Sequence, residues 1–273
     1  MAFAIKDVPL TRANTVPDNP LTLLFQDDAL LVVHKPAGLL VHRSPIARHE
    51  TEFALQYARA LNGGDHVYPV HRLDRPTSGV LVFARDPLTA SQLGQQMMAG
   101  QVHKTYLAMV RGWAPESGVI DHPLKEQPDD RRLRHQPQPV RDALTRFRTL
   151  ATTEIPVAIE GYDSSRYSLV ECSPATGRKH QIRRHLKHIS HPIIGDANHG
   201  RGRHNRYFAQ RFGEARLMLA ATAIAFTHPI HGSAVEIATP PESGFLRVMS
   251  IFPPSVCDQL LSLGATVTES EVS

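Results

Sequence analysis

Short runs of aliphatic, β-branched and aromatic residues recur along the chain, separated by turn-forming residues, a pattern typical of β-strands. The runs at 21–25 and 30–33 are separated by Asp27 and Asp28, which predicts a pair of strands joined by a tight turn. The apolar run at 80–83 predicts a buried strand. Further strands are predicted at 104–110, 144–150, 167–171, 217–226 and 234–237.

Between some of these strands, apolar residues recur at helical spacing, which predicts helices. Thr51 is expected to cap a helix that ends at Gly63, and Asp86 followed by Pro87 is expected to start one that runs to Gly100. A helix opening at Thr176 would place its core stripe on every third or fourth residue. That stripe consists of Ile182, Leu186 and Ile189. Two short helices are predicted near 244–251 and 255–263.

Many strands with few helices between them favour an α+β fold built on a mixed, mostly antiparallel sheet flanked by helices and loops. Residues 1–20 contain three prolines and are expected to form an extended arm, followed by one catalytic domain over 21–263 and a polar tail over 264–273. Residues 121–140 contain four prolines and predict a long loop.

Charge is unevenly distributed along the 273 residues. The formal net charge is only +4, yet residues 178–216 contain ten Lys and Arg against Asp196 and Glu214. This excess favours a polyanionic partner, and a solvated charged face is the alternative. The two cysteines, Cys172 and Cys257, argue against a disulfide scaffold or a cysteine-based zinc site. We find no signal peptide and no apolar run of membrane-spanning length, and expect a cytoplasmic protein without membrane contact.

The loop that precedes the strand at 80–83 carries the first candidate chemistry. Residues 71–79 read HRLDRPTSG, with Asp74 between Arg72 and Arg75. Neighbouring cations favour a charged carboxylate, which can act as a nucleophile or base. The alternative is an ordinary ion pair in a surface loop.

A second candidate is the basic stretch that begins at Thr176. Lys179, Arg183 and Lys187 are four residues apart and are expected to form a cationic ridge that binds phosphates. One of these cations could instead pair with a buried carboxylate. The nearby histidines do not have metal-ligand spacing, and a protein-kinase interpretation of His-Arg-Leu-Asp fails because the chain lacks a glycine-rich phosphate loop and Asp-Phe-Gly.

These stretches together resemble the RluA family of pseudouridine synthases. Residues 71–79 match its HRLDxxTSG signature, and KTYLAMVRG at 104–112 and TGRKHQIR at 176–183 match two further motifs in the same order. KPAG at 35–38 matches a motif nearer the N-terminus, and the similarity covers about residues 21–240. The resemblance implies the pseudouridine synthase fold, and we expect no RNA-binding S4 domain before it.

The resemblance also implies the activity and the roles of individual residues. The family isomerises uridine in RNA without a cofactor or metal. Asp74 matches the catalytic aspartate that attacks a ring or ribose carbon, Arg183 the arginine paired with it, and Tyr106 the tyrosine that packs on the target base. Arg72 matches the residue that enters the RNA stack when the base leaves. The residues expected to hold the RNA backbone are Arg178, Lys179, Arg184 and Lys187.

The finer likeness is to the subgroup that modifies uridine 65 of tRNA, the TruC type. It rests on 41–44 (VHRS), the Arg-Pro pair in the central loop, 184–186 (RHL) and 195–200 (GDANHG). We therefore expect a monomeric enzyme whose partner is tRNA, with ribosomal RNA as the competing substrate. A non-catalytic RNA-binding module is a distant alternative, and a metal-dependent nuclease is disfavoured because its carboxylate or histidine clusters are missing from the sequence.

Overall fold

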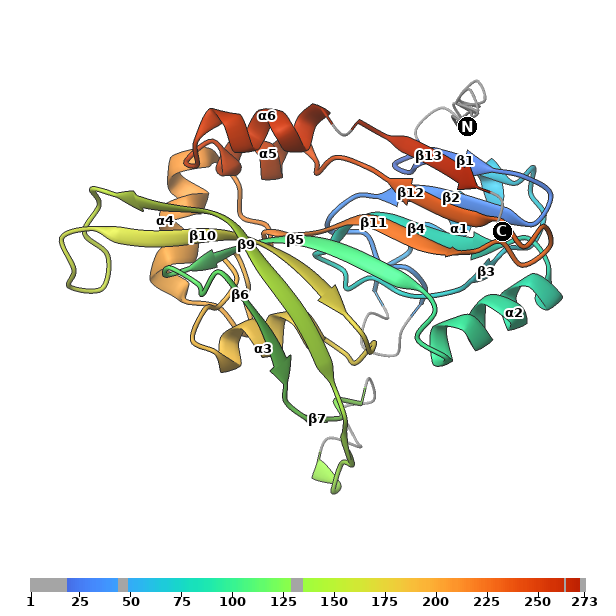
Figure 1. Ribbon diagram of the computed structural model, residues 1–273, viewed down its shortest axis with the longest axis horizontal. Helices are drawn as coiled ribbons and strands as arrows, with labels where there is room; N and C mark the ends of the chain where they lie inside the picture. Colours follow the sequence, from blue (N-terminus) through green and yellow to red (C-terminus); the bar gives the residue numbers. More distant parts are fainter. Residues whose placement is uncertain (1–18, 44–48, 129–134, 263, 271–273) are drawn as a thin grey trace, which may run out of the picture.

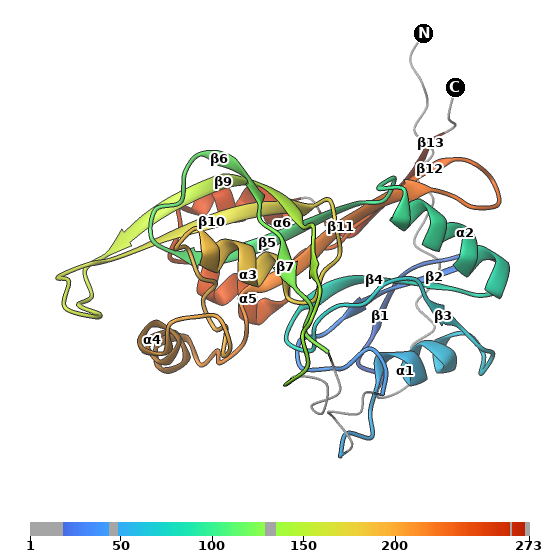
Figure 2. The ribbon, with the colours of Figure 1, turned by 90° about the horizontal axis from the view of Figure 1, so that it is seen from below.

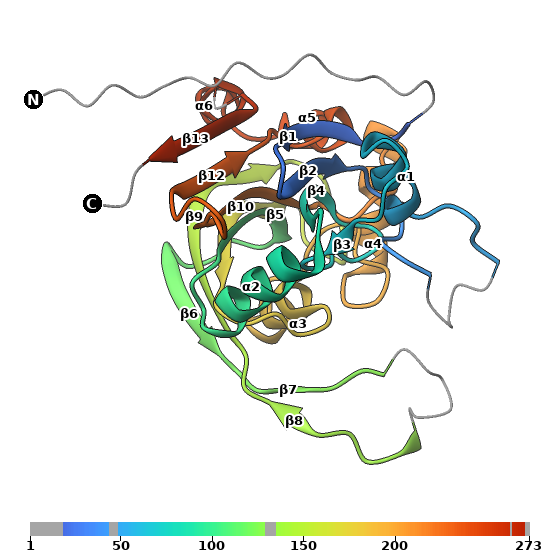
Figure 3. The ribbon, with the colours of Figure 1, turned by 90° about the vertical axis from the view of Figure 1, so that its right-hand side faces the viewer.

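An eleven-stranded mixed sheet organises the computed structural model, which describes residues 19–43, 49–128, 135–262 and 264–270 (Figure 1). Its main path runs β1-β2-β4-β11-β5-β10-β9-β6, with β3 added to β4 and with β12 and β13 added to β11 in turn. The strands are β1 (Thr22–Gln26), β2 (Leu30–Lys35), β3 (Tyr68–Pro69), β4 (Ser78–Ala84), β5 (His103–Arg111), β6 (Ser117–Asp121), β9 (Leu144–Ile155), β10 (Ser165–Pro174), β11 (Leu219–Thr227), β12 (Ala234–Ala238) and β13 (Thr266–Ser270). A separate pair, β7 (Leu124–Lys125) and β8 (Val140–Arg141), extends away from the body (Figure 3).

Helices pack on both faces of this sheet. They are α1 (Ala54–Leu61), α2 (Pro87–Met98), α3 (Gln181–His188), α4 (Gly202–Phe212), α5 (Ser243–Met249) and α6 (Pro254–Ser262). Figure 2 shows α1 and α2 with β1–β4 on one side of the molecule and α3 and α4 with β6, β9 and β10 on the other, while β5 and β11 run between them. All strand pairs are antiparallel except β4 with β11, so the predicted α+β class with a mixed, mostly antiparallel sheet is confirmed.

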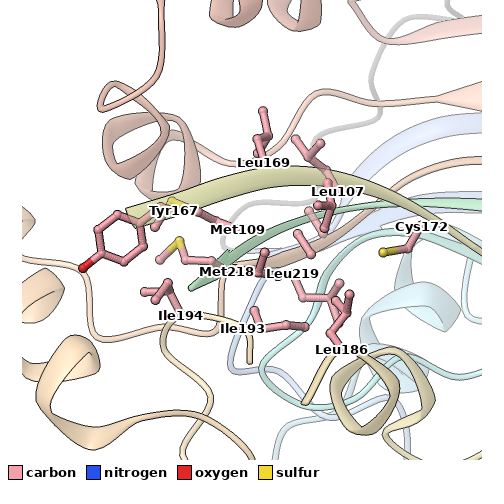
Figure 4. Close-up of a cluster of buried hydrophobic side chains, with 14 of the residues drawn as sticks. Leu107, Met109, Tyr167, Leu169, Cys172, Leu186, Ile193, Ile194, Met218 and Leu219 are labelled. Carbon is pink, nitrogen blue, oxygen red and sulfur yellow. The ribbon is translucent and has the colours of Figure 1, made fainter. Parts of the chain in front are cut away.

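The largest buried cluster lies where α3, α4 and α5 cover β5, β10 and β11. Leu186 of α3, with Ile193 just beyond the helix, packs beneath apolar side chains of the central strands, among them Leu107 and Leu219 (Figure 4). Ile182 and Leu186 are buried and Ile189 is partly buried, which confirms the predicted core stripe of α3. This packing fixes the helix that carries Arg183 against the centre of the sheet.

Helix starts were predicted with mixed success. Asp86 does cap α2, because its carboxylate accepts a hydrogen bond of 2.9 Å from the backbone N–H of Thr89. Thr51 does not cap α1: the cap is Phe53, whose N–H donates to the Gln56 side chain. The prediction that a helix opens at Thr176 is also wrong, since α3 begins at Gln181.

Six of the described elements were not predicted. They are α4, β3, β6, β7, β8 and β13, and β13 occupies half of the predicted polar tail. Its residues are polar except for Val267, and their backbone groups pair with β12 along five register positions. The predicted N-terminal arm lies almost wholly outside the described residues.

The parallel contact between β4 and β11 places one end of the central loop beside β11, with β5 as the next strand. Gly79 pairs with Ala221, and Ala221 pairs in turn with Tyr106 across the next strand. The three residues therefore form one row across the sheet, so the loop that precedes β4 ends at the same level as Tyr106, with β11 between them.

Gly79 is required for this close approach. Its φ of +114° lies in a region that favours glycine, and an added β-carbon would overlap the carbonyl oxygen of Ala221. We expect Gly79→Ala to lower the free energy of unfolding by about 3 kcal/mol or more in urea denaturation. Gly94→Ala on α2 is the matched control, because no neighbouring atom lies within 4 Å and alanine favours a helix. A Gly79→Ala protein as stable as this control would contradict the argument.

Candidate active site

Asp74 lies in the loop between β3 and β4, in the wall between two cavities of about 730 and 420 Å³. Arg72, His180 and Arg183 line both cavities, whereas Tyr106 lines only the smaller one. Both volumes fall within the range of small-molecule sites. The structure thus brings the predicted carboxylate, arginine and tyrosine to one place, although they are far apart in the sequence.

Arg183 is the cation that pairs with Asp74. Its Nη1 donates to Asp74 Oδ2 at 3.0 Å, and only 3% of its side chain is exposed. Of the two roles considered for this arginine, pairing with a carboxylate is therefore the one that the structure supports. Arg75, predicted to flank Asp74 as a cation, instead forms an ion pair with Glu50 at 2.8 Å and donates to the carbonyl of Gly38.

Asp196 anchors Arg183 from the opposite side and was not predicted as a site residue. Its carboxylate accepts from Arg183 Nε at 2.7 Å and from Nη2 at 2.8 Å, a two-pronged pair that fixes the plane of the guanidinium. Burial opposes the charge on Arg183, but hydrogen bonds and ion pairing with Asp196 and Asp74 outweigh it and raise the Arg183 pKa. Burial likewise opposes the charge on Asp196, yet Arg183 and two backbone N–H groups lower the Asp196 pKa.

Lys35, in the KPAG segment, supports the Asp74 loop through hydrogen bonds to backbone carbonyls. The side chain is fully buried, and its Nζ donates to the carbonyls of Pro36, Leu39 and Arg75 at 2.7, 2.8 and 3.3 Å. Burial lowers the pKa of Lys35 to about 7, although Glu242 opposes the shift. Because the Arg75 carbonyl adjoins Asp74, this ammonium group holds the loop in place next to the carboxylate.

Arg216 and Glu242 form a second support that joins three distant segments. The Arg216 guanidinium forms an ion pair with Glu242 and donates to Ser78 Oγ at 2.8 Å. The Glu242 carboxylate also accepts from the backbone N–H of Ala37. These contacts tie the KPAG segment to the start of β4, and the sequence alone did not identify either residue.

Tyr106 projects from β5 into the smaller cavity. Desolvation and the nearby Asp74 charge both raise the pKa of its hydroxyl. The phenol is therefore neutral at physiological pH, and it presents an aromatic face and an O–H donor to the same space as the carboxylate.

The cations expected to hold RNA do not form the predicted ridge. Arg183 turns inward, and Lys179 precedes α3 instead of lying on it. Arg178 and Lys187 are exposed, and Lys179 and Arg184 are partly exposed. Arg72 is exposed where the two cavities meet. Of these five cations, Arg72, Arg178 and Lys179 line the cavities, whereas Arg184 and Lys187 line neither.

One described cluster has metal-ligand composition: Asp27, His228 and His231. Hydrogen bonds account for it. The backbone N–H groups of Ile230 and His231 donate to His228 Nδ1, so the imidazole proton is on Nε2, which donates to Asp27 Oδ2 at 2.8 Å. The cluster closes the turn between β11 and β12 and lies outside both cavities.

Comparison with known proteins identifies the family model, relatives and solved structures that this chain resembles. Residues 29–188 match the family model described as RNA pseudouridylate synthase. Relatives of this chain include tRNA pseudouridine synthase C of Vibrio cholerae, 48% identical over 77% of this chain and 86% of the relative, and that of Pasteurella multocida, 46% identical over 85% and 96%. The solved structure of human RNA pseudouridylate synthase domain containing 4 is 26% identical, with a TM-score of 0.63 over 84% of this chain and 92% of that one. No helix in the described part of the chain is long and apolar enough to cross a membrane.

Proposed function

The chain belongs to the RNA pseudouridylate synthase family, and on that basis we propose that it converts uridine to pseudouridine in tRNA with Asp74 as the nucleophile. The observation that carries this proposal is the position of Asp74, in a cavity with Tyr106 and paired with the buried Arg183. A carboxylate held this way is oriented and only partly exposed, as a nucleophile requires.

The geometry supports a different role for each of these residues in the isomerisation. Asp74 attacks the uridine nucleotide, the N1–C1′ bond breaks, and the base turns and rejoins the sugar through C5. The bond to Asp74 then breaks and the carboxylate is restored, while C5 loses its proton and N1 gains one. Arg183 holds the carboxylate aligned, and Tyr106 packs on the base within the smaller cavity. Because atoms are only rearranged within the nucleotide, the reaction consumes no co-reactant.

A uridine stacked within an RNA arm cannot reach Asp74 without leaving the stack. Arg72 is exposed beside Asp74 and carries a long cationic side chain suited to the vacated space. We infer that it fills the gap left by the departing base. Arg178, Lys179, Arg184 and Lys187 then hold the flanking phosphates, an arrangement that makes affinity fall with salt.

Arg72→Ala is expected to lose activity mainly on structured RNA. Unstacking and unpairing a base cost a few kcal/mol, and a mismatched arm needs less of this energy. Single-turnover rates of wild type and variant on a folded tRNA and on the same tRNA with a mismatched target pair provide the measurement. The defect should shrink on the mismatched arm. An equal defect on both substrates would place Arg72 in the chemical step or in loop structure.

For the target nucleotide, we propose uridine 65 of tRNA. The support is the GDANHG segment and the other subgroup features, together with relatives named tRNA pseudouridine synthase C. The test is to map pseudouridines in tRNA and ribosomal RNA from cells with and without the protein. Loss confined to position 65 of tRNA is expected, and loss confined to ribosomal RNA would overturn the tRNA assignment.

A further inference from the structure

Two imidazoles provide a second connection between Asp74 and the loop that carries Asp196. His180 Nε2 lies 3.9 Å from Asp74 Oδ2, and His180 Nδ1 lies 3.1 Å from His199 Nε2. The two rings meet edge to face, with their centroids 5.3 Å apart. The backbone N–H of His199 donates to Asp196 Oδ1 at 2.9 Å. Asp196 therefore reaches the nucleophile both through Arg183 and through this histidine pair.

The backbone of His180 is in an unfavourable conformation. Its φ is +55° immediately before α3, a left-handed position that glycine or asparagine adopts at lower cost than histidine. Only 16% of the side chain is exposed. Strained residues of this kind cluster at functional sites, where surrounding contacts offset their cost.

Proton positions at these imidazoles follow from their neighbours. The Asp74 carboxylate can only accept a hydrogen bond, so His180 can donate to it only in the tautomer that carries the proton on Nε2. Burial lowers the pKa of His180 to about 4, although Asp74 opposes the shift, and burial also lowers the pKa of His199. A neutral His180 with its proton on Nε2 has an acceptor at Nδ1, which receives the N–H of His199 Nε2.

We propose that His180 is a positioning residue for Asp74 and that His199 selects the tautomer in which His180 can donate to it. This inference rests on the proposed role of Asp74 as nucleophile. The 3.9 Å separation exceeds a hydrogen bond, and catalytic contacts of this type shorten in the substrate complex. Arg183 and His180 both approach Oδ2 of Asp74. Because these partners occupy Oδ2, the other carboxylate oxygen, Oδ1, is the one assigned to attack the nucleotide.

His180→Gly separates positioning from structure. Glycine relieves the left-handed backbone, so the variant should unfold at the same temperature as wild type or higher. Its single-turnover rate at saturating tRNA should fall about 10- to 100-fold, the size of effect seen when partners that orient a reactive group are removed. The dissociation constant for tRNA should change by less than about twofold.

His180→Gln is the conservative rescue, because its amide N–H reaches about as far as the imidazole Nε2. It should retain a rate within about fivefold of wild type. Ser190→Gly is the matched control, since Ser190 also has a positive φ, +67°, at the other end of α3. It should match wild type in rate while gaining the same kind of backbone relief.

The outcomes distinguish failure of the positioning role of His180 from failure of the proposed activity. A wild-type rate in His180→Gly, or a Gln variant as slow as the Gly variant, would contradict the positioning role. Rates that merely follow thermal stability across the series would also contradict it. Failure of the wild-type protein to form pseudouridine would instead contradict the proposed function itself.

Discussion

Asp74→Asn is expected to abolish pseudouridine formation, with a loss of about a thousandfold or more in single-turnover rate. Asparagine has the same shape, but its neutral amide cannot act as the attacking group. Arg183 keeps both of its hydrogen bonds to Asp196, so the fold should persist. Binding of tRNA, measured by filter retention, should remain within about twofold of wild type. The substitution leaves unchanged all of the cations that are proposed to hold phosphate.

The control for this substitution is Asp65→Asn, which makes the same chemical change at an exposed carboxylate that lines neither cavity. It should turn over at the wild-type rate. Residual activity of Asp74→Asn within tenfold of wild type would remove Asp74 from the role of nucleophile.

Arg183→Lys is expected to cause the second large loss, about a hundredfold in rate. One guanidinium serves Asp74 through Nη1 and Asp196 through Nε and Nη2 at the same time. A lysine ammonium is a point donor that cannot span both carboxylates. The Asp196 side chain is fully buried, and disrupting a buried pair costs about 3–5 kcal/mol, so thermal unfolding should also shift downward.

Arg148→Lys provides the comparison, because Arg148 pairs with Glu171 at 3.1 Å on the exposed face of the sheet. Exposed pairs contribute about 0–1 kcal/mol, so this variant should differ little from wild type in rate or stability. If Arg183→Lys changed only the salt dependence of tRNA binding, Arg183 would be a phosphate contact and its pairing with Asp74 would lack catalytic importance.

Local sequence signals predicted the types of most elements but not all of their limits. The apolar run at 80–83 and the Asp86–Pro87 start of α2 depend on neighbouring residues, and both are present in the structure. The start of α3 was misplaced because the left-handed backbone of His180 interrupts the chain after Thr176, and no periodicity reveals that angle. Strand β13 was missed because Val267 is its only apolar residue, and its backbone pairing with β12 leaves no pattern in the sequence.

The candidate site was predictable only as far as its motifs. Asp74, Tyr106 and Arg183 were identified through family resemblance, and the structure places them together. The four-residue spacing of Lys179, Arg183 and Lys187 suggested one face, but α3 buries the face that includes Arg183 against Asp196. Asp196 and Glu242 were not predicted, because a carboxylate that anchors an arginine from a distant loop has no signature in the sequence.

The contacts that complete this site join residues that are far apart in the sequence and therefore leave the ribosome at different times. Asp74 and Arg183 are separated by 109 positions, and Ser78 and Arg216 by 138. Closing loops of this length costs entropy before any contact can offset it, and folding slows as such contacts accumulate. The β2–β4 pairing can form early in synthesis, whereas the nucleophile acquires its arginine only after α3 emerges. A nascent chain ending before that helix would carry the whole HRLDRPTSG loop without the cation that its aspartate needs.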